Sequence, residues 1–158
     1  MIDKKHLLKE LEEDFEKLKK ELGFKSNLDE LDLEFGIKDS VLNAGFVSED
    51  LADQILSRIV EHFRESVSYL NNLLASNSNL LAAQTEVKLF NSEADKKFVW
   101  DLTKVGMKFS SMKAFISLNR DKKLQAEFID SSLEAWRNIL RPGIEGLLKR
   151  AYDAWNKE

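Results

Sequence analysis

Two histidines and many carboxylates are the residues from which this chain could build a metal or acid-base site. His62 and Glu65 lie about one helical turn apart, and a histidine and a carboxylate at that spacing can contribute to a metal site inside a helical bundle. One such pair supplies too few ligands, and a half-buried histidine beside an apolar stripe is the more common role. We therefore predict no metal site, no cofactor and no catalytic residue.

The sequence also lacks the short motifs of common enzymes. It has no GxSxG, GxxxxGK[ST], GxGxxG or HExxH pattern, and it has no cysteine. An enzyme that relied on carboxylates alone would escape this test, because catalytic and solvated Asp and Glu look alike on a helix. An enzyme or small-ligand binder with a pocket inside the bundle therefore stays an alternative.

A run of basic residues is the feature closest to a nucleic-acid site. Residues 96–123 carry eight Lys or Arg against Asp101 and Asp121, and Lys97, Lys104 and Lys108 form a basic stripe. Such a stripe beside aromatic residues can follow phosphates. The net charge of −4, with 17 acidic against 10 basic residues in positions 1–65, favours a solvated flank. A nucleic-acid-associated accessory subunit using residues 96–123 is thus a further alternative.

Composition indicates an ordinary folded protein. The 158 residues are 43% hydrophobic and 33% charged, which suits one domain with its own core. No apolar run approaches the roughly 20 residues that a membrane span needs. We expect a cytoplasmic protein that does not enter a membrane.

The elements that would position these residues have the helical period. The main one is a central helix at about residues 92–118, opened by Ser92 and Asp95 as a capping box. One seam of this helix carries Phe98, Leu102, Val105, Phe109, Met112 and Ile116. Trp100, Met107 and Ala114 hold the opposite side and form the candidate interface. A helix that is apolar on both sides must be covered on both, by its own domain or by a partner.

The first half of the chain reads as a long helix, a connector and a second long helix. The first helix covers residues 3–22 and ends at Gly23. The connector, residues 24–47, is predicted to pack across the bundle end, with Asn27 capping a short helix that ends at Gly36 and Asp39 starting a single turn. Ser48 is predicted to cap the second long helix, which runs to Leu74.

The remaining segments are less uniform. Residues 75–79 indicate a break, and residues 80–90 could form a strand or a helix; we predict a helix, because a lone strand would have no partner. A helix over 120–140 follows the central one, and Pro142 opens a last helix after a corner or kink at residues 141–143.

These patterns predict an all-α fold, a single-domain helical bundle of five or six helices over residues 1–158. For function they favour a non-enzymatic protein-protein interaction or assembly module that binds a protein partner or forms a homo-oligomer. Helix count alone identifies no family or activity.

Overall fold

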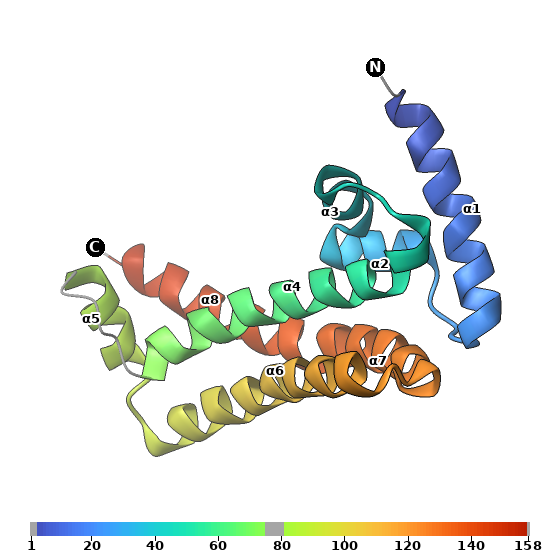
Figure 1. Cartoon of the computed structure of the whole chain (residues 1–158). Coiled ribbons are helices and arrows are strands. Elements are labelled where there is room, and N and C mark those ends of the chain that lie inside the picture. The colour runs from blue at the N-terminus through green and yellow to red at the C-terminus, as the bar shows by residue number, and fades with distance from the viewer. Residues whose placement is uncertain (1–2, 75–80, 158) are drawn as a thin grey trace. The chain divides into compact units, whose positions relative to one another are not determined.

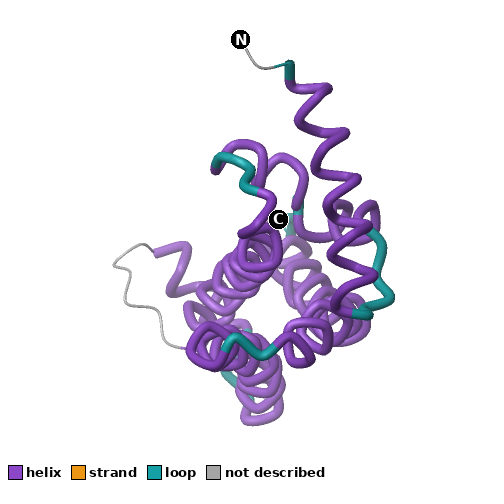
Figure 2. The backbone as a smooth tube through the Cα atoms, turned by 45° about the vertical axis from the view of Figure 1, so that its right-hand side comes forward, coloured by secondary structure: helices purple, strands orange, loops and turns teal. Residues whose placement is uncertain are grey.

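The structure of this chain is a computed structural model that describes residues 3–74 and 81–157. Its elements, in chain order, are α1 (Lys4–Leu22), α2 (Leu28–Phe35), α3 (Ile37–Ala44), the 3-10 turn η1 (Ser48–Asp50), α4 (Leu51–Leu74), α5 (Leu81–Leu89), α6 (Glu93–Asn119), α7 (Lys122–Ala135), the π-helical turn η2 (Trp136–Leu140) and α8 (Arg141–Trp155) (Figure 1). Figure 2 shows helices and loops and no strand among these residues. The all-α prediction is therefore confirmed. Seven helical runs replace the predicted five or six, since α7, η2 and α8 follow without a break.

Capping residues near the helix termini account for most helix ends. Asp3 caps α1 by accepting the N–H of Lys5 at 3.1 Å, and Gly23 ends the helix. Asn27 and Glu30 form a capping box at the start of α2, so two backbone N–H groups that the helix itself cannot satisfy find acceptors. These boundaries agree with the prediction for α1 and α2.

One connector element differs from the prediction. α3 begins at Ile37 and not at Asp39, because Gly36 both ends α2 and precedes α3, and the predicted single turn is an eight-residue helix. The helix ends at Gly45, as the sequence predicts. Ser48 does not cap α4 directly, since it opens η1, which leads into Leu51. The helix predicted over residues 80–90 is present as α5, whereas the predicted break at 75–79 lies outside the described residues.

The helix continues through residues 141–143, where the sequence predicts a corner or kink. Leu140 and Arg141 keep helical backbone angles, and the N–H of Arg141 donates to the carbonyl of Trp136 across η2. Pro142 lies in the first turn of α8, where a residue without an N–H is tolerated. The π turn leads into α8 without a break in the helix, which excludes a corner, and a kink at this point stays a prediction.

Two compact units make up the chain. Unit 1 comprises residues 1–62 and 111–133, and unit 2 comprises residues 63–110 and 134–158. In unit 1, Phe15 meets Phe24 edge to face with ring centroids 5.5 Å apart. The largest buried side chains of this unit come from all of its helices: Leu11, Phe15, Leu31, Phe35, Ile37, Ile55, Ile59, Ile116 and Phe128.

The core of unit 2 is built from α4, α6, η2 and α8, together with Phe90, which follows α5. Its buried side chains include Phe63, Leu70, Phe90, Val99, Phe109, Trp136, Leu140 and Leu147. Phe63 joins two of these segments, since its ring stacks on Phe109 and meets Trp136 edge to face at 6.0 Å. The organisation of residues 1–158 as one domain remains a prediction.

Candidate interaction face on helix α6

One side of α6 is packed into the core of unit 2. The ring of Phe109 is 2% exposed and stacks on Phe63, with centroids 4.9 Å apart and planes 11° apart. One turn earlier, a Cβ at Gly106 would lie 2.4 Å from Cγ2 of Val67. Only glycine therefore allows α6 to approach α4 this closely.

The opposite side of α6 faces solvent. Trp100 is 53% exposed and Met107 is 50% exposed, and their seven-residue spacing puts them on one face of the helix. Ala114, the third residue predicted for this side, is exposed within unit 1. The residues that the structure describes leave these side chains uncovered, and their role as an interface stays a prediction.

Phe98 corrects the predicted seam. It was placed among the inward residues, but it is 45% exposed, whereas the adjacent Val99 is fully buried. Phe98 lies in the second turn of α6, near the start of the helix. Periodicity assigns a residue to a face of the helix, but it does not show how far along that face the covering elements extend. The inward positions that hold are Leu102, Phe109 and Ile116, while Val105 and Met112 are half-buried.

The predicted basic stripe borders the exposed side chains. Lys97 and Lys104 both bind Asp101, with Nζ to carboxylate oxygen distances of 2.7 and 2.8 Å, and their hydrogen bonds lower the pKa of Asp101 to about 2. Nζ of Lys108 lies 5.8 Å from the Phe109 ring centroid, and no ion pair joins it to a described residue. We call Trp100 and Met107, with Lys97, Lys104 and Lys108 beside them, the α6 face.

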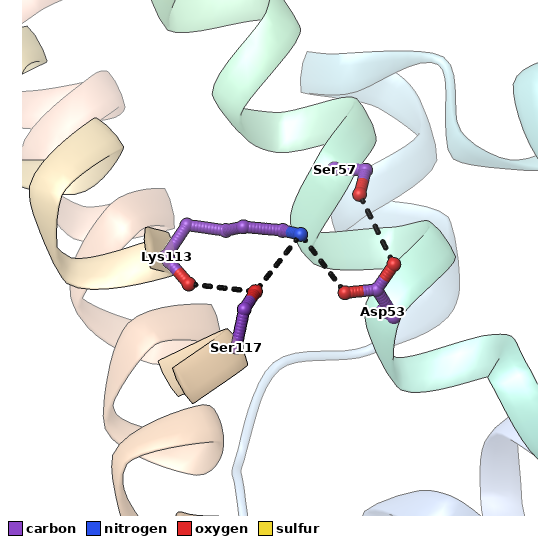
Figure 3. Close-up of polar contacts among 4 residues, drawn as sticks. All are labelled: Asp53, Ser57, Lys113 and Ser117. Carbon is purple, nitrogen blue, oxygen red and sulfur yellow. Dashed lines mark hydrogen bonds and ion pairs between the residues drawn. The ribbon is translucent and has the colours of Figure 1, made fainter. Parts of the chain in front are cut away.

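Further along the basic segment, lysines form ion pairs within unit 1. Figure 3 shows Lys113, whose Nζ contacts Asp53 of α4 at 2.9 Å and Oγ of Ser117 at 3.2 Å. Asp53 also accepts a hydrogen bond from Ser57 at 3.4 Å. Lys122 pairs with Glu21 of α1. Two of the cations in residues 96–123 are therefore already paired with carboxylates of unit 1.

His62 has a packing role in unit 1. Its ring is half-buried and meets Phe35 edge to face, with centroids 5.3 Å apart. No group of three or more His, Asp or Glu side chains among residues 3–74 and 81–157 could hold a metal ion.

Asp130 is a structural residue that the sequence did not reveal. Its carboxylate accepts hydrogen bonds from the N–H of Lys25, the N–H of Ser26 and the hydroxyl of Ser26 at 2.6–3.1 Å. Burial disfavours the charged carboxylate, yet these hydrogen bonds outweigh it and hold the pKa of Asp130 below its ordinary value. Only the folded chain brings the 25–26 loop to α7.

Arg150 is the corresponding residue of unit 2. Its guanidinium binds both carboxylate oxygens of Asp95 at 2.7 and 3.1 Å, donates to the carbonyl of Leu89 and lies 4.7 Å from the Phe90 ring centroid. The hydrogen bond from Arg150 is the main cause that lowers the pKa of Asp95. Arg150 thus ties α8 to the start of α6 and the end of α5.

An acidic hollow lies between α1 and α2 in unit 1. It has a volume of about 470 Å³ and is lined by Glu12, Glu16, Asn27, Leu28, Asp29 and Glu30. Leu33, one helical turn after Asp29 and Glu30 on α2, is 78% exposed. The sequence shows acidic residues here but not the hollow, because the packing of α1 against α2 creates it.

Comparison with protein-family models, with curated proteins and with solved structures finds no match for this chain. The geometry of its own residues is therefore the basis for any functional argument. Of the helices that the structure describes, none combines the length and the hydropathy required to cross a membrane.

Proposed function

We propose that this chain is a non-enzymatic protein-protein interaction module that self-associates through the α6 face. The observation that carries the proposal is the half exposure of Trp100 and Met107 on a helix whose other side forms the core of unit 2. Tryptophan and methionine are enriched in the buried centres of interfaces. An exposed pair with a polar border is typical of a contact surface.

The gain from covering this face is appreciable. Half of a tryptophan side chain exposes on the order of 100 Å² of mostly apolar surface, and burying it is worth on the order of 2 kcal/mol. Met107 adds a further contribution of similar kind. These gains favour association, while the ordering of side chains and the loss of rigid-body freedom oppose it, so a concentration-dependent equilibrium is expected.

The two alternatives have less support. A pocket enzyme would need polar groups converging on a cavity near His62, but this ring packs on Phe35, and the acidic hollow is lined by α1 and α2 residues that do not include it. A nucleic-acid site would need cations available to phosphates, but Lys97 and Lys104 already bind Asp101.

The test compares two charge insertions in unit 2 by sedimentation equilibrium. Met107→Glu puts an uncompensated charge into the proposed contact and should give a folded monomer with an unchanged melting temperature. Leu148→Glu is the matched control, because Leu148 is 48% exposed against 50% for Met107 but lies on α8. It should associate like the wild type.

Two results would overturn the proposal. One is a wild type that sediments as a monomer at every accessible concentration. The other is a Met107→Glu variant that unfolds as readily as a variant of the buried Phe109, since Met107 would then belong to the core.

A further inference from the structure

The α6 face has a chemical counterpart on the same chain. The acidic hollow supplies the carboxylates of Glu12, Glu16, Asp29 and Glu30, with the exposed Leu33 one helical turn after the last two. We infer that the self-association proposed above, on which this inference rests, is head-to-tail: the α6 face of one copy docks on the acidic hollow and Leu33 of the next.

The two surfaces are chemically complementary. On α6, Lys104 lies four residues after Trp100 and three before Met107, so its ammonium group borders both apolar side chains. On α2, Asp29 and Glu30 lie four and three residues before Leu33, so the carboxylates border an apolar side chain in the same way. Each surface therefore offers apolar contact with charge at its edge. Asp101 binds Lys97 and Lys104, but the three lysines leave the α6 face net positive, opposite in sign to the net negative acidic hollow.

The local charges of the two surfaces also favour this contact. Residues 97–108 carry three lysines against Asp101, whereas the four carboxylates of the acidic hollow are met by Lys38, whose Nζ lies 2.7 Å from Asp29 and 3.7 Å from Glu12. Lys108, the lysine of the α6 face without an ion pair to a described residue, is the cation best placed to enter a hollow lined by four carboxylates. At about 470 Å³ the hollow has the size of a small-ligand pocket and can accept a lysine side chain.

A symmetric contact between identical faces is unfavourable. In an isologous interface both copies present the same patch, so an α6 face would meet a second net-positive α6 face. Two acidic hollows would likewise repel each other. Like charges held together across an interface are costly, whereas the α6 face and the acidic hollow attract each other.

A head-to-tail contact has a distinct consequence for assembly. Every copy carries one α6 face and one acidic hollow, so docking leaves a free surface at each end of the pair. Such a contact closes into a ring or continues as a filament, whereas an isologous contact stops at a dimer.

The experiment uses two complementary variants of the full chain. Trp100→Ser with Met107→Ser removes the apolar part of the α6 face without adding charge, and Glu16→Lys with Leu33→Ser alters the acidic side. All four positions are exposed, so circular dichroism melts should match the wild type. Glu13→Lys is the control for net charge, because Glu13 is an exposed α1 residue outside the lining of the acidic hollow.

Sedimentation velocity should show weaker association of each variant by more than about tenfold in dissociation constant, while Glu13→Lys stays close to the wild type. Mixing the two variants should restore association, because each retains the surface that the other lacks. The mixed complex should stop at one copy of each, whereas the wild type grows further. Raising the salt from about 0.1 M to about 1 M should weaken the wild-type association, because the Debye length falls from about 10 to about 3 Å.

Other outcomes separate this inference from the proposed function. If the Glu16→Lys and Leu33→Ser variant associates like the wild type while the α6 variant is monomeric, the head-to-tail mode is wrong and self-association through α6 stands. If mixing the two variants gives no complex, the head-to-tail mode is likewise wrong. A wild type that is monomeric throughout defeats both proposals.

Discussion

Gly106→Ala probes the tightest contact described for α6. A Cβ at this position would lie 2.4 Å from Cγ2 of Val67 and 3.8 Å from the carbonyl oxygen of Phe63. Carbon atoms in good contact are about 3.5–4.0 Å apart, so one helix must move by on the order of 1 Å or Val67 must change rotamer. A valine in a helix has one strongly preferred rotamer, so the strain falls mainly on the spacing between α4 and α6.

The expected loss follows from two opposing terms. Overpacking a core position costs about 1–3 kcal/mol, and the severity of this overlap places Gly106→Ala in the upper part of that range. Alanine is a better helix former than glycine by about 0.8–1.0 kcal/mol, which offsets part of the cost. The free energy of unfolding should therefore fall by about 1–2 kcal/mol, equivalent to about 2–8 °C in melting temperature for a chain of this length.

Urea denaturation followed by far-ultraviolet circular dichroism measures this loss, with Gly146→Ala as the matched control. A Cβ at Gly146 has no atom within 4 Å, so this α8 variant should gain about 0.8–1.0 kcal/mol from helix propensity alone. The two identical substitutions should change the free energy of unfolding in opposite directions.

A double-mutant cycle with Val67→Ala isolates the contact itself. Removing Cγ2 should abolish the overlap, so Gly106→Ala should no longer destabilise in the Val67→Ala background, with a coupling energy of about 0.5–3 kcal/mol. The reasoning is refuted if Gly106→Ala stabilises the wild type as much as Gly146→Ala does.

Two further changes test the cores of the separate units. Phe109→Ala should lower the free energy of unfolding by about 3–5 kcal/mol in urea denaturation, because Phe109 is 2% exposed; a loss under about 1 kcal/mol would place it outside the core. Asp130→Asn should cost about 1–3 kcal/mol near neutral pH, because the amide nitrogen cannot accept the hydrogen bonds of the carboxylate. Because folding lowers the pKa of Asp130, its contribution is complete above the unfolded value of about 3.9 and disappears as the pH falls through the folded pKa. Acid titrations of both proteins should therefore converge at low pH, and a constant difference would contradict the role given to ionised Asp130.

Local signals in the sequence account for most helix boundaries. Asn27 and Gly36 bracket α2 as expected, because a capping side chain and a left-handed glycine act within a few residues of the helix end. Ser92 accepts the N–H of Asp95 at 3.1 Å, which agrees with the predicted start of α6. Periodicity likewise identified the face of α6 that carries Phe109.

Features that depend on distant segments of the chain could not be predicted from local sequence signals. Phe98 shares the period of the inward residues, but its exposure depends on where the neighbouring elements end. Asp130 has the pattern of a solvated residue, and only the fold brings a loop 104 residues away to its carboxylate. The candidate interface followed from the period of Trp100 and Met107, whereas the acidic hollow required the contact of α1 with α2.

Gly36 shapes how the length of this chain can vary. Gly36 is both the C-cap of α2 and the N-cap of α3, with φ 64° and ψ 46°. Arg58 donates from Nε to the carbonyl of the neighbouring Phe35 at 2.7 Å. An added or deleted residue here would turn Ile37 away from its buried position, because each residue rotates a helix by about 100°. In the loop between α3 and η1, Gly45 and Val47 are exposed, and the Gly45 carbonyl accepts a hydrogen bond from Nε2 of Gln54 at 2.9 Å. Homologous chains should therefore differ in length near residues 45–47 and keep the joint between α2 and α3 at a single residue.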